Sequence, residues 1–202
     1  MTATTLTETA QRILAAATRQ FAAKGLAGAR VDEIAREAGV NKQLIYHYFG
    51  GKLELYNEVL GRLVESSQPK REAEAACDTL AEKMELLTRL GMHPNSALWQ
   101  RLLGWEALET DPAGGIVREE DRRATWERHV ESVRAAQAAG EVDPSLDPEL
   151  VAVAVVSMAV LPFMLPQVVK FMTGRLPTDE AFLEPYESLV GELVARLGQP
   201  RT

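Results

Sequence analysis

The side chains best suited to molecular recognition are concentrated between residues 41 and 52. A glutamine can bond the edge of adenine through two parallel hydrogen bonds, and a lysine can donate to the acceptors of guanine. Tyrosine hydroxyls and further lysines suit phosphate oxygens. The stretch supplies these types at Asn41, Lys42, Gln43, Tyr46, His47, Tyr48 and Lys52. Their chemistry indicates contact with DNA.

The residues that must position these side chains have the spacing of a helix-turn-helix. Helices are expected over about 31–38 and 42–48, with Asn41 capping the second. The two helices cross closely, so the contact requires a small side chain, which Ala35 supplies. Gly39 can adopt a positive φ in the turn without a Cβ clash. The shared core is expected from Ile13, Leu14, Phe21, Ile34, Ala38, Val40, Ile45 and Phe49.

The second helix of such a unit lies in the major groove, with its N-terminal residues at the base edges. This geometry places Asn41, Lys42, Gln43 and His47 at bases.

Residues 10–55 resemble the DNA-binding domain of the TetR family of repressors. The matching pieces are Ile34-Ala35, Ala38-Gly39-Val40, Ile45-Tyr46-His47-Tyr48-Phe49, and Lys52 followed by Leu55. The resemblance implies base contacts from Lys42, Gln43, Leu44 and His47, and phosphate contacts from Tyr46, Tyr48 and Lys52.

Three positions depart from the pattern of that family. A hydroxyl residue commonly stands where this chain has Arg30, Gly at the position of Gln43, and Ser or Thr at that of Leu44. Arg30 can still reach a phosphate, and Leu44 can touch a thymine methyl. We therefore expect a sequence preference particular to this chain.

Composition predicts that the rest of the chain is helical too. Ala, Leu, Glu and Arg dominate, and these are strong helix formers. Gly25 is expected to end the first helix. Further helices, separated by Gly and Pro, are expected over about 52–65, 70–90, 96–109, 117–139, 148–173 and 178–198. We predict an all-α fold with a three-helix DNA-binding domain at 1–50 and a helical effector-binding and dimerisation domain at 51–202.

The stretch 150–169 is almost uncharged and is long enough to suggest a transmembrane helix. Pro162 and Pro166 interrupt it, however, and no cluster of positive charge flanks it. We favour a helix buried on all sides, which a partner subunit would most easily supply. The resemblance implies a homodimer that pairs its last two helices across a two-fold axis, and no membrane.

The aromatic residues of the middle helices have two interpretations. They are either ordinary core or, as the resemblance implies, part of a mostly apolar cavity for a small-molecule effector. The candidates for such a cavity are Trp99, Trp105, Trp126, His129 and Phe163.

Charge is unevenly distributed along the chain. The net charge is −7, which argues against a protein that coats nucleic acid with its whole surface. Residues 1–60 hold seven Lys or Arg against six Asp or Glu, so the remaining residues carry the negative excess. Only the N-terminal part can approach a phosphate backbone comfortably.

Catalytic and metal-binding motifs are not found in the sequence. There is no Gly-rich phosphate loop, no HExxH and no G-x-S-x-G, and the three histidines lie far apart. Cys77 is the single cysteine, which fits a reducing compartment. The first residues lack the features of a signal peptide. We expect a cytoplasmic protein that is not an enzyme and holds no metal or cofactor.

These observations together predict a homodimeric regulator of transcription on a near-palindromic operator. An effector would shift the helix that starts near Lys52 and lower the affinity for DNA, which makes the regulator a repressor. The alternatives are an activator, a small helical enzyme or ligand carrier with a vestigial motif, and a membrane-associated protein anchored by 150–169.

Overall fold

The structure, a computed structural model, describes residues 7–65, 73–74, 76–91, 94–109 and 119–198. Within these ranges the chain is helical and has no strand, which confirms the predicted all-α fold. The helices are α1 (Glu8–Gly28), α2 (Val31–Ala38), α3 (Lys42–Phe49), α4 (Lys52–Glu65), α6 (Leu80–Leu90), α7 (Pro94–Glu109), α8 (Glu119–Ala138), α9 (Pro148–Met164), α10 (Pro166–Thr173), α11 (Glu180–Ala195) and the 3₁₀ turn η1 (Arg196–Gly198).

The chain divides into two compact units. Unit 1 draws on Met1–Ser66 and Leu98–Glu119, and unit 2 on Ser67–Ala97 and Glu120–Thr202. The helix α7 therefore has its first residues in unit 2 and its remaining turns in unit 1.

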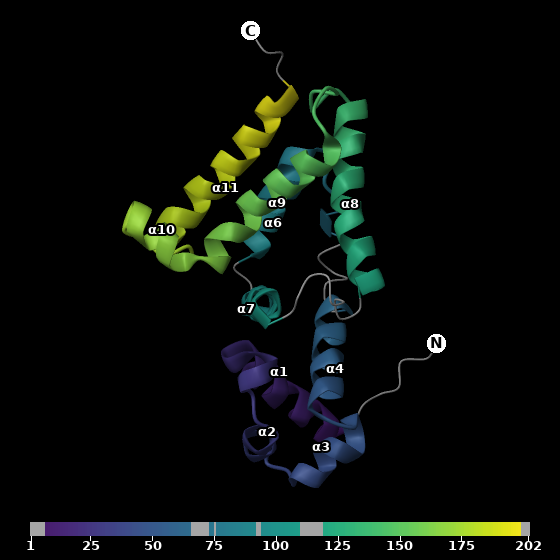
Figure 1. Ribbon diagram of the computed structural model, residues 1–202. Coiled ribbons are helices and arrows are strands. Elements are labelled where there is room, and N and C mark those ends of the chain that lie inside the picture. The colour runs from purple at the N-terminus through teal and green to yellow at the C-terminus, as the bar shows by residue number, and fades with distance from the viewer. Residues whose placement is uncertain (1–6, 66–72, 75, 92–93, 110–118, 199–202) are drawn as a thin grey trace. The chain divides into compact units, whose positions relative to one another are not determined.

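Unit 1 packs α1 against both α2 and α4 (Figure 1). Phe21 is fully buried and meets the ring of Tyr56 edge-on, with the ring centroids 5.1 Å apart. The residues predicted to form the shared core all lie in or against this one cluster, including Ile13, Ile34 and Ile45 at 0% exposure. The core of the helix-turn-helix is therefore the predicted one.

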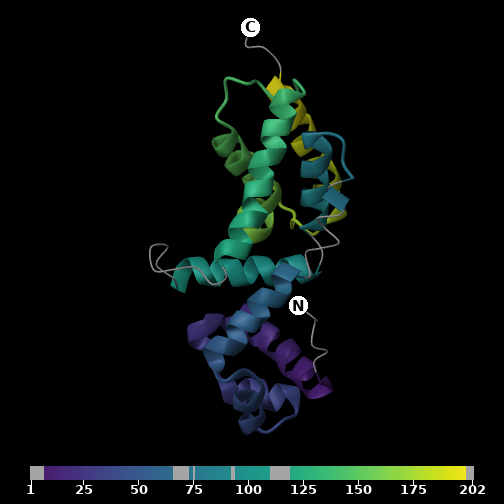
Figure 2. The ribbon, with the colours of Figure 1, turned by 90° about the vertical axis from the view of Figure 1, so that its right-hand side faces the viewer.

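Unit 2 is built around α6, α9 and α11, which pack against one another (Figure 2). Its core joins residues from these helices with Val133 of α8, and Met84, Val155 and Val194 are almost completely buried. Glu85 of α6 lies directly over Gly191 of α11, where an added Cβ would collide with its carboxylate. A side chain at position 191 would therefore have to displace the flexible Glu85 carboxylate.

Two predicted helices were too long. Of the one expected over 70–90, residues 70–72 and 75 lie outside the described residues, and residues 73–74 are helical. A non-helical segment at 76–79 separates them from α6, which begins at Leu80 because Thr79 and Glu82 form a reciprocal capping box. The one expected over 148–173 is two helices with a bend of 86° between them. Leu165 leaves the helical region because Pro166 disfavours a helical residue before it and lacks an N–H.

The apolar stretch 150–169 is buried on one face only within the protomer. Val151, Ala152, Val155 and Ala159 are buried in unit 2. Leu150, Val153 and Leu161, at steps of three and eight residues along α9, are 70%, 66% and 53% exposed. The expected burial on all sides is thus not reached in a single chain.

Among the described residues, no single helix is long and apolar enough to cross a membrane. The bent pair of α9 and α10 passes that test of length and composition when the two helices are taken together.

Candidate DNA-binding interface

The turn between α2 and α3 has the conformation that the sequence predicts. Gly39 lies in the left-handed region with φ 64° and ψ 40°, and Ala35 at the helix contact is only 4% exposed. An arginine from α1 reinforces the turn, because Nη2 of Arg12 donates to the carbonyls of Ala38 at 2.5 Å and Gly39 at 3.0 Å. These carbonyls are among the groups that a helix end leaves without partners.

The recognition helix α3 is anchored on one side and open on the other. Asn41 caps it, since its side-chain oxygen accepts from the backbone N–H of Gln43 at 3.0 Å. Ile45 is fully buried and fixes the helix to unit 1. The predicted contact residues Asn41, Lys42, Gln43, Tyr46, His47 and Tyr48 are exposed, and Leu44 is half-buried.

The aromatic residues of α3 divide between surface and core. Tyr46 and Tyr48 are 48% and 38% exposed, whereas Phe49 packs against the core. The ring of His47 meets that of Tyr48 edge-on at 5.2 Å, so the two residues support each other at the surface. The structure therefore leaves the predicted polar residues of α3 exposed, whereas Leu44 packs partly against the core.

Lys52 also makes hydrogen bonds within the protein that the sequence does not predict. Its Nζ donates to the carbonyls of Ala29 at 3.0 Å and Ala27 at 3.3 Å. The ammonium of a lysine has three donors, so one remains for a phosphate. Arg30, by contrast, is exposed, and its guanidinium makes no hydrogen bond or ion pair within the part of the chain that the structure describes.

Three acidic residues of α2 pair with three cations in unit 1. Glu33 pairs with Lys24 and Glu37 with Arg19, both at 2.5 Å and both reaching back to α1. Asp32 pairs instead with Lys42 of the recognition helix, at 2.8 Å. The hydrogen bond from Lys42 holds the pKa of Asp32 below its ordinary value, and the same contact raises the pKa of Lys42.

Two side chains of α7 make hydrogen bonds with the end of α1. Gly25 interrupts the helix with φ 69° and ψ −179°, as the sequence predicts, and the next two backbone N–H groups turn outward. The carboxylate of Glu109 accepts from Leu26 at 3.0 Å and from Ala27 at 3.2 Å, and the indole of Trp105 donates to the carbonyl of Ala22 at 3.2 Å. A Cβ at position 25 would lie 2.3 Å from Glu109 Oε1.

The residues predicted to line an effector cavity do not form one cluster within either unit. Trp99 and Trp105 belong to unit 1, where Trp99 packs against the core and Trp105 against α1. Trp126, His129 and Phe163 belong to unit 2. Trp126 lies near His129, with ring centroids 5.7 Å apart, and Phe163 contacts Gly91.

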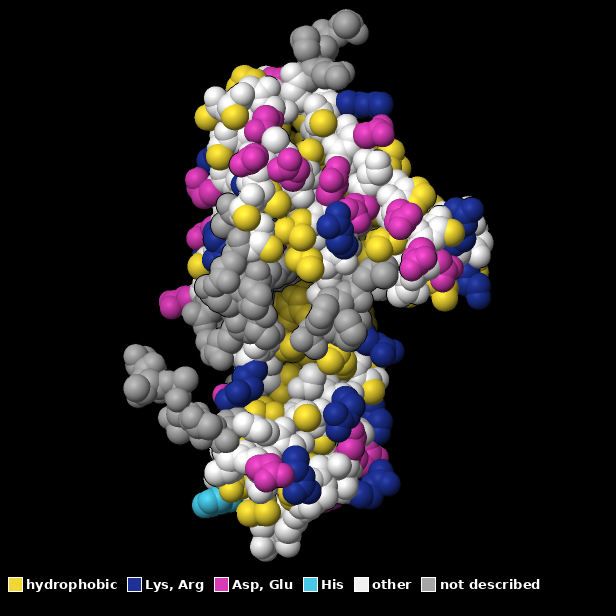
Figure 3. Space-filling view, turned by 180° about the vertical axis from the view of Figure 1, so that it is seen from behind, with side chains coloured by type: hydrophobic (Ala, Val, Ile, Leu, Met, Phe, Trp, Pro, Cys, Tyr) yellow, Lys and Arg dark blue, Asp and Glu magenta, His cyan; other side chains and the backbone are white. Residues whose placement is uncertain are grey.

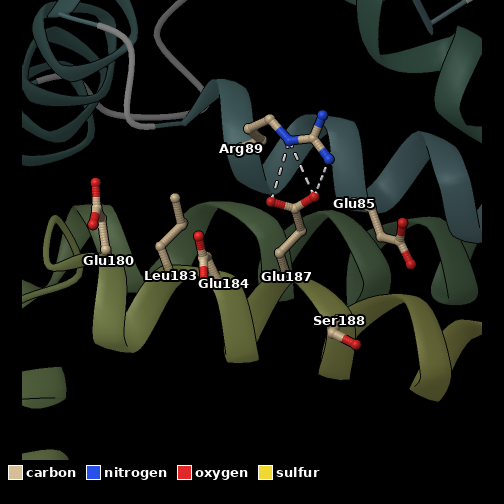
Figure 4. A pocket seen from close by; sticks show the side chains of 7 residues that line it. All are labelled: Glu85, Arg89, Glu180, Leu183, Glu184, Glu187 and Ser188. Atoms are coloured by element: carbon tan, nitrogen blue, oxygen red, sulfur yellow. Dashed lines mark hydrogen bonds and ion pairs between the residues drawn. The ribbon is translucent and has the colours of Figure 1, made fainter.

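Unit 2 contains a pocket of about 530 Å³ between α6 and α11 (Figure 4). Two side chains from α6 and five from α11 line it, and a bidentate ion pair joins Arg89 to Glu187 at its edge. The lining residues are Glu85, Arg89, Glu180, Leu183, Glu184, Glu187 and Ser188. Most of them are charged, unlike the apolar lining typical of small-molecule sites.

Surface charge differs between the two units, as the sequence predicts. On the face drawn in Figure 3, Asp and Glu side chains gather over unit 2, whereas Lys and Arg are the more prominent charges on unit 1. No group of three or more His, Cys, Asp or Glu among the described residues is arranged to hold a metal ion.

Comparison with known families accounts for both parts of the chain. The sequence model of bacterial regulatory proteins of the tetR family matches residues 13–59, and that of the tetracyclin repressor-like C-terminal domain matches residues 91–196. The HTH-type transcriptional repressor SCO4008 of Streptomyces coelicolor is 33% identical, over 82% of this chain and 84% of its own length. The regulator SrpR of Pseudomonas putida is 48% identical over 29% of this chain and 28% of its own length.

Solved structures share the fold over nearly the whole chain. The transcriptional regulator SCO4942 of Streptomyces coelicolor superposes with a TM-score of 0.71 at 27% identity, covering 94% of this chain and 98% of its own. A regulator from Saccharomonospora viridis in complex with choline superposes with a TM-score of 0.71 at 18% identity, covering 93% of this chain and 95% of its own. FadR of Bacillus subtilis in complex with stearoyl-CoA superposes with a TM-score of 0.69 at 18% identity, covering 93% of this chain and 98% of its own.

The chain belongs to the TetR family and is a helix-turn-helix, DNA-binding regulator of transcription. The predicted family, fold class and general function are thereby confirmed.

Three residues of this interface were missed by sequence reasoning. Arg12, Asp32 and Glu109 act on partners from other helices, and no local pattern identifies those partners. The one usable signal was the requirement that the carbonyls at the end of α2 and the N–H groups after Gly25 find partners.

Proposed function

We propose that this chain represses transcription by binding a near-palindromic operator as a homodimer, and that a small-molecule effector releases it. The observation that carries the proposal is the recognition helix α3. It presents exposed polar side chains at its N-terminal end while buried Ile45 and the Arg12 contact fix its position. Residues 1–50 form the DNA-binding domain in this proposal, and residues 51–202 bind the effector and dimerise.

The base contacts are assigned to the start of α3. Gln43 is placed to bond adenine, Lys42 to donate to a guanine, and Leu44 to touch a thymine methyl. Asn41 keeps its amide nitrogen for DNA because its oxygen serves as the helix cap. His47, one turn further along α3, contacts a base as well.

The phosphate contacts surround these base contacts. Tyr46 and Tyr48 offer exposed hydroxyls, and Arg30 offers a guanidinium that has no partner among the described residues. Lys52 contributes its remaining donor while its other bonds hold the carbonyls of Ala27 and Ala29. Lys52 thus both contacts the operator and stabilises the loop before α2.

The homodimer is proposed to form through α9 and α11. The exposed side of α9 carries Leu150, Val153 and Leu161, and that of α11 carries Leu189 and Leu193. Large apolar side chains exposed in such number on neighbouring helices are typical of an interaction site. Pairing these helices with their copies would also complete the burial that the composition of 150–169 predicts.

The effector response is proposed to reach the DNA-binding domain through α4 and α7. Lys52, the first residue of α4, holds the loop before α2 on one side. Glu109 and Trp105 of α7 hold the end of α1 on the other. An effector that displaces either helix therefore disturbs residues 25–30, and with them the start of α2. The cytoplasm is the proposed location of this response.

The effector site itself is proposed among the middle helices. That two neighbours of this fold were crystallised with choline and with stearoyl-CoA supports a ligand-binding role for the fold. Trp99, Trp105, Trp126, His129 and Phe163 remain the proposed lining residues. Since Trp105 already bonds Ala22, a ligand that reached it would act directly on the end of α1.

The test is selection of tight binders from a pool of random duplexes near physiological salt. We expect a near-palindrome whose half-sites are about one helical turn of DNA apart. Its affinity should fall with salt by a slope of about −0.9 per phosphate contact. A pool that never enriches with folded dimer present would contradict the proposal and favour a helical carrier or enzyme.

A further inference from the structure

The recognition helix begins with a lysine that is tied to the helix before it. Nζ of Lys42 lies 2.8 Å from Oδ1 of Asp32, in the first turn of α2. The two side chains are 44% and 62% exposed, so the pair lies at the surface. It occupies the place from which the proposed base contacts start.

An acidic residue suits the first turn of α2, but this does not explain why Asp32 is paired with Lys42. Ion pairs between exposed side chains contribute little to folding. A carboxylate beside a lysine that is proposed to contact DNA also repels phosphates, which lowers the affinity for any duplex. Glu33 and Glu37 pair with cations of α1, whereas Asp32 pairs with the recognition helix itself. The contrast indicates that Asp32 acts on Lys42.

We propose that Asp32 is a positioning residue that determines specificity, because it directs the ammonium of Lys42 toward a base edge and away from phosphates. The inference rests on the proposed operator binding. An ammonium has three N–H donors, so one can remain on Asp32 while another meets a guanine acceptor. Asp32 therefore needs no contact with DNA of its own.

The physical reason is the flexibility of lysine. Its ammonium is a point charge on a four-carbon stem and has no directional preference of its own. Without Asp32, Lys42 would neutralise whichever phosphate lies within reach, and that contribution is the same for every sequence. With Asp32 in place, the ammonium of Lys42 contacts a base instead, and this contact distinguishes one sequence from another.

The experiment compares Asp32→Asn with Glu33→Gln in the full-length dimer. Both variants remove one negative charge from the first turn of α2, and only the first releases the lysine of the recognition helix. Affinity is measured on the selected operator and on a random duplex over a range of salt concentrations. Circular dichroism and sedimentation verify the fold and the dimer of each variant.

We expect Asp32→Asn to steepen the salt slope on the random duplex by about 1.8, since each dimer gains two phosphate contacts. The ratio of operator to random affinity should fall roughly tenfold, the scale of one lost base contact. Glu33→Gln should strengthen binding to both duplexes by a similar, smaller factor, because the lysine that it releases is Lys24 of α1, outside the recognition helix.

A double-mutant cycle with Lys42→Ala separates the positioning role from a general effect of charge. If Asp32 acts through Lys42, Asp32→Asn in the Lys42→Ala background should behave as Glu33→Gln does. A steepened slope that persists without Lys42, or an Asp32→Asn variant that matches Glu33→Gln in the native background, overturns the inference.

The proposed function fails in a different way. If the native dimer enriches no operator, operator binding is wrong and the specificity claim falls with it. If an operator is enriched and the two acidic variants behave alike, the proposed function stands and the role of Asp32 is wrong.

Discussion

The helix-turn-helix of unit 1 and the helices α9 and α11 of unit 2 differ in how far their side chains find partners within one chain. In unit 1 the backbone groups at the turn and after Gly25 find partners within one chain, supplied by Arg12 and by Glu109. In unit 2 only part of the apolar side chains of α9 and α11 is buried. On α9, for example, Val155 is buried while Val153 is 66% exposed. The core of the helix-turn-helix therefore forms within one protomer, whereas the proposed dimer would bury the exposed side of the C-terminal helices.

The largest expected effect comes from the incomplete region. Val153→Glu places a charge on the exposed apolar face of α9 and should convert the dimer to monomers, because a buried unpaired carboxylate is strongly unfavourable. Operator affinity should then fall by about 10²-fold or more, since two half-sites are no longer bound together. Sedimentation and operator titration measure the two results.

A matched control for this change is Leu108→Glu. Leu108 is 82% exposed on α7 and lies outside the proposed dimer face. This variant should remain a dimer. A monomeric Leu108→Glu, or a fully dimeric Val153→Glu, would contradict the assignment of α9 to the interface.

The next effect concerns the complete region. Gly39→Ala forces a side chain into the left-handed conformation, at a cost of about 1–2 kcal/mol. Its Cβ would also lie 2.7 Å from Nη2 of Arg12 and displace the guanidinium, which removes hydrogen bonds of about 1 kcal/mol. Chemical denaturation gives the loss in the free energy of unfolding.

Gly140→Ala isolates the contribution of Arg12. Gly140 has φ 79°, and nothing lies within 4 Å of an added Cβ, so it has the same backbone strain without the neighbour. We expect Gly39→Ala to be the more destabilising of the two by about 1 kcal/mol. Equal losses would show that the arginine contact adds nothing.

A smaller effect is expected where α7 meets α1. Glu109→Ala should raise the hydrogen-exchange rates of the Leu26 and Ala27 amides, which lose their acceptor. Operator affinity should fall severalfold with an unchanged salt slope, because no phosphate contact is removed. Unchanged exchange at these two amides would disprove the contact, and a changed slope would indicate that Glu109 acts on DNA directly.

The smallest effect is that of pH on the acidic residues of α2. Hydrogen bonds to cations and to Gln20 hold the pKa values of Asp32, Glu33 and Glu37 below their ordinary values. Their contribution to stability is therefore fully present above about pH 4–5 and is lost as the pH falls through the lowered values. The test is a triple variant with Asp32→Asn, Glu33→Gln and Glu37→Gln. Its free energy of unfolding should differ less between pH 6 and pH 3 than that of the native chain.

Local patterns were sufficient to predict most of the helix-turn-helix. Ala35, Gly39 and Ile45 lie at positions that the geometry of two crossing helices dictates, and the structure has them as expected. The predictions failed where a local signal was misjudged. Thr79 and Pro166 each divide a helix that apolar periodicity predicts to be continuous.

The rest could not be predicted because it depends on partners far away in the chain. Arg12 bonds carbonyls 26 and 27 residues later, and Glu109 bonds amides 82 and 83 residues earlier. Such contacts follow from how the helices pack, which periodicity alone does not specify. The tryptophans illustrate the same limit, because their separation between the two units is a consequence of tertiary structure.

The central claim is that α3 reads base edges, and Gln43 tests it most directly. Affinities of native protein and Gln43→Ala are measured on the selected operator and on duplexes with single base-pair changes. We predict that the variant loses about 1–3 kcal/mol of discrimination at one base pair of each half-site, with an unchanged salt slope. An equal loss of affinity on every sequence, or no loss at all, would contradict the claim.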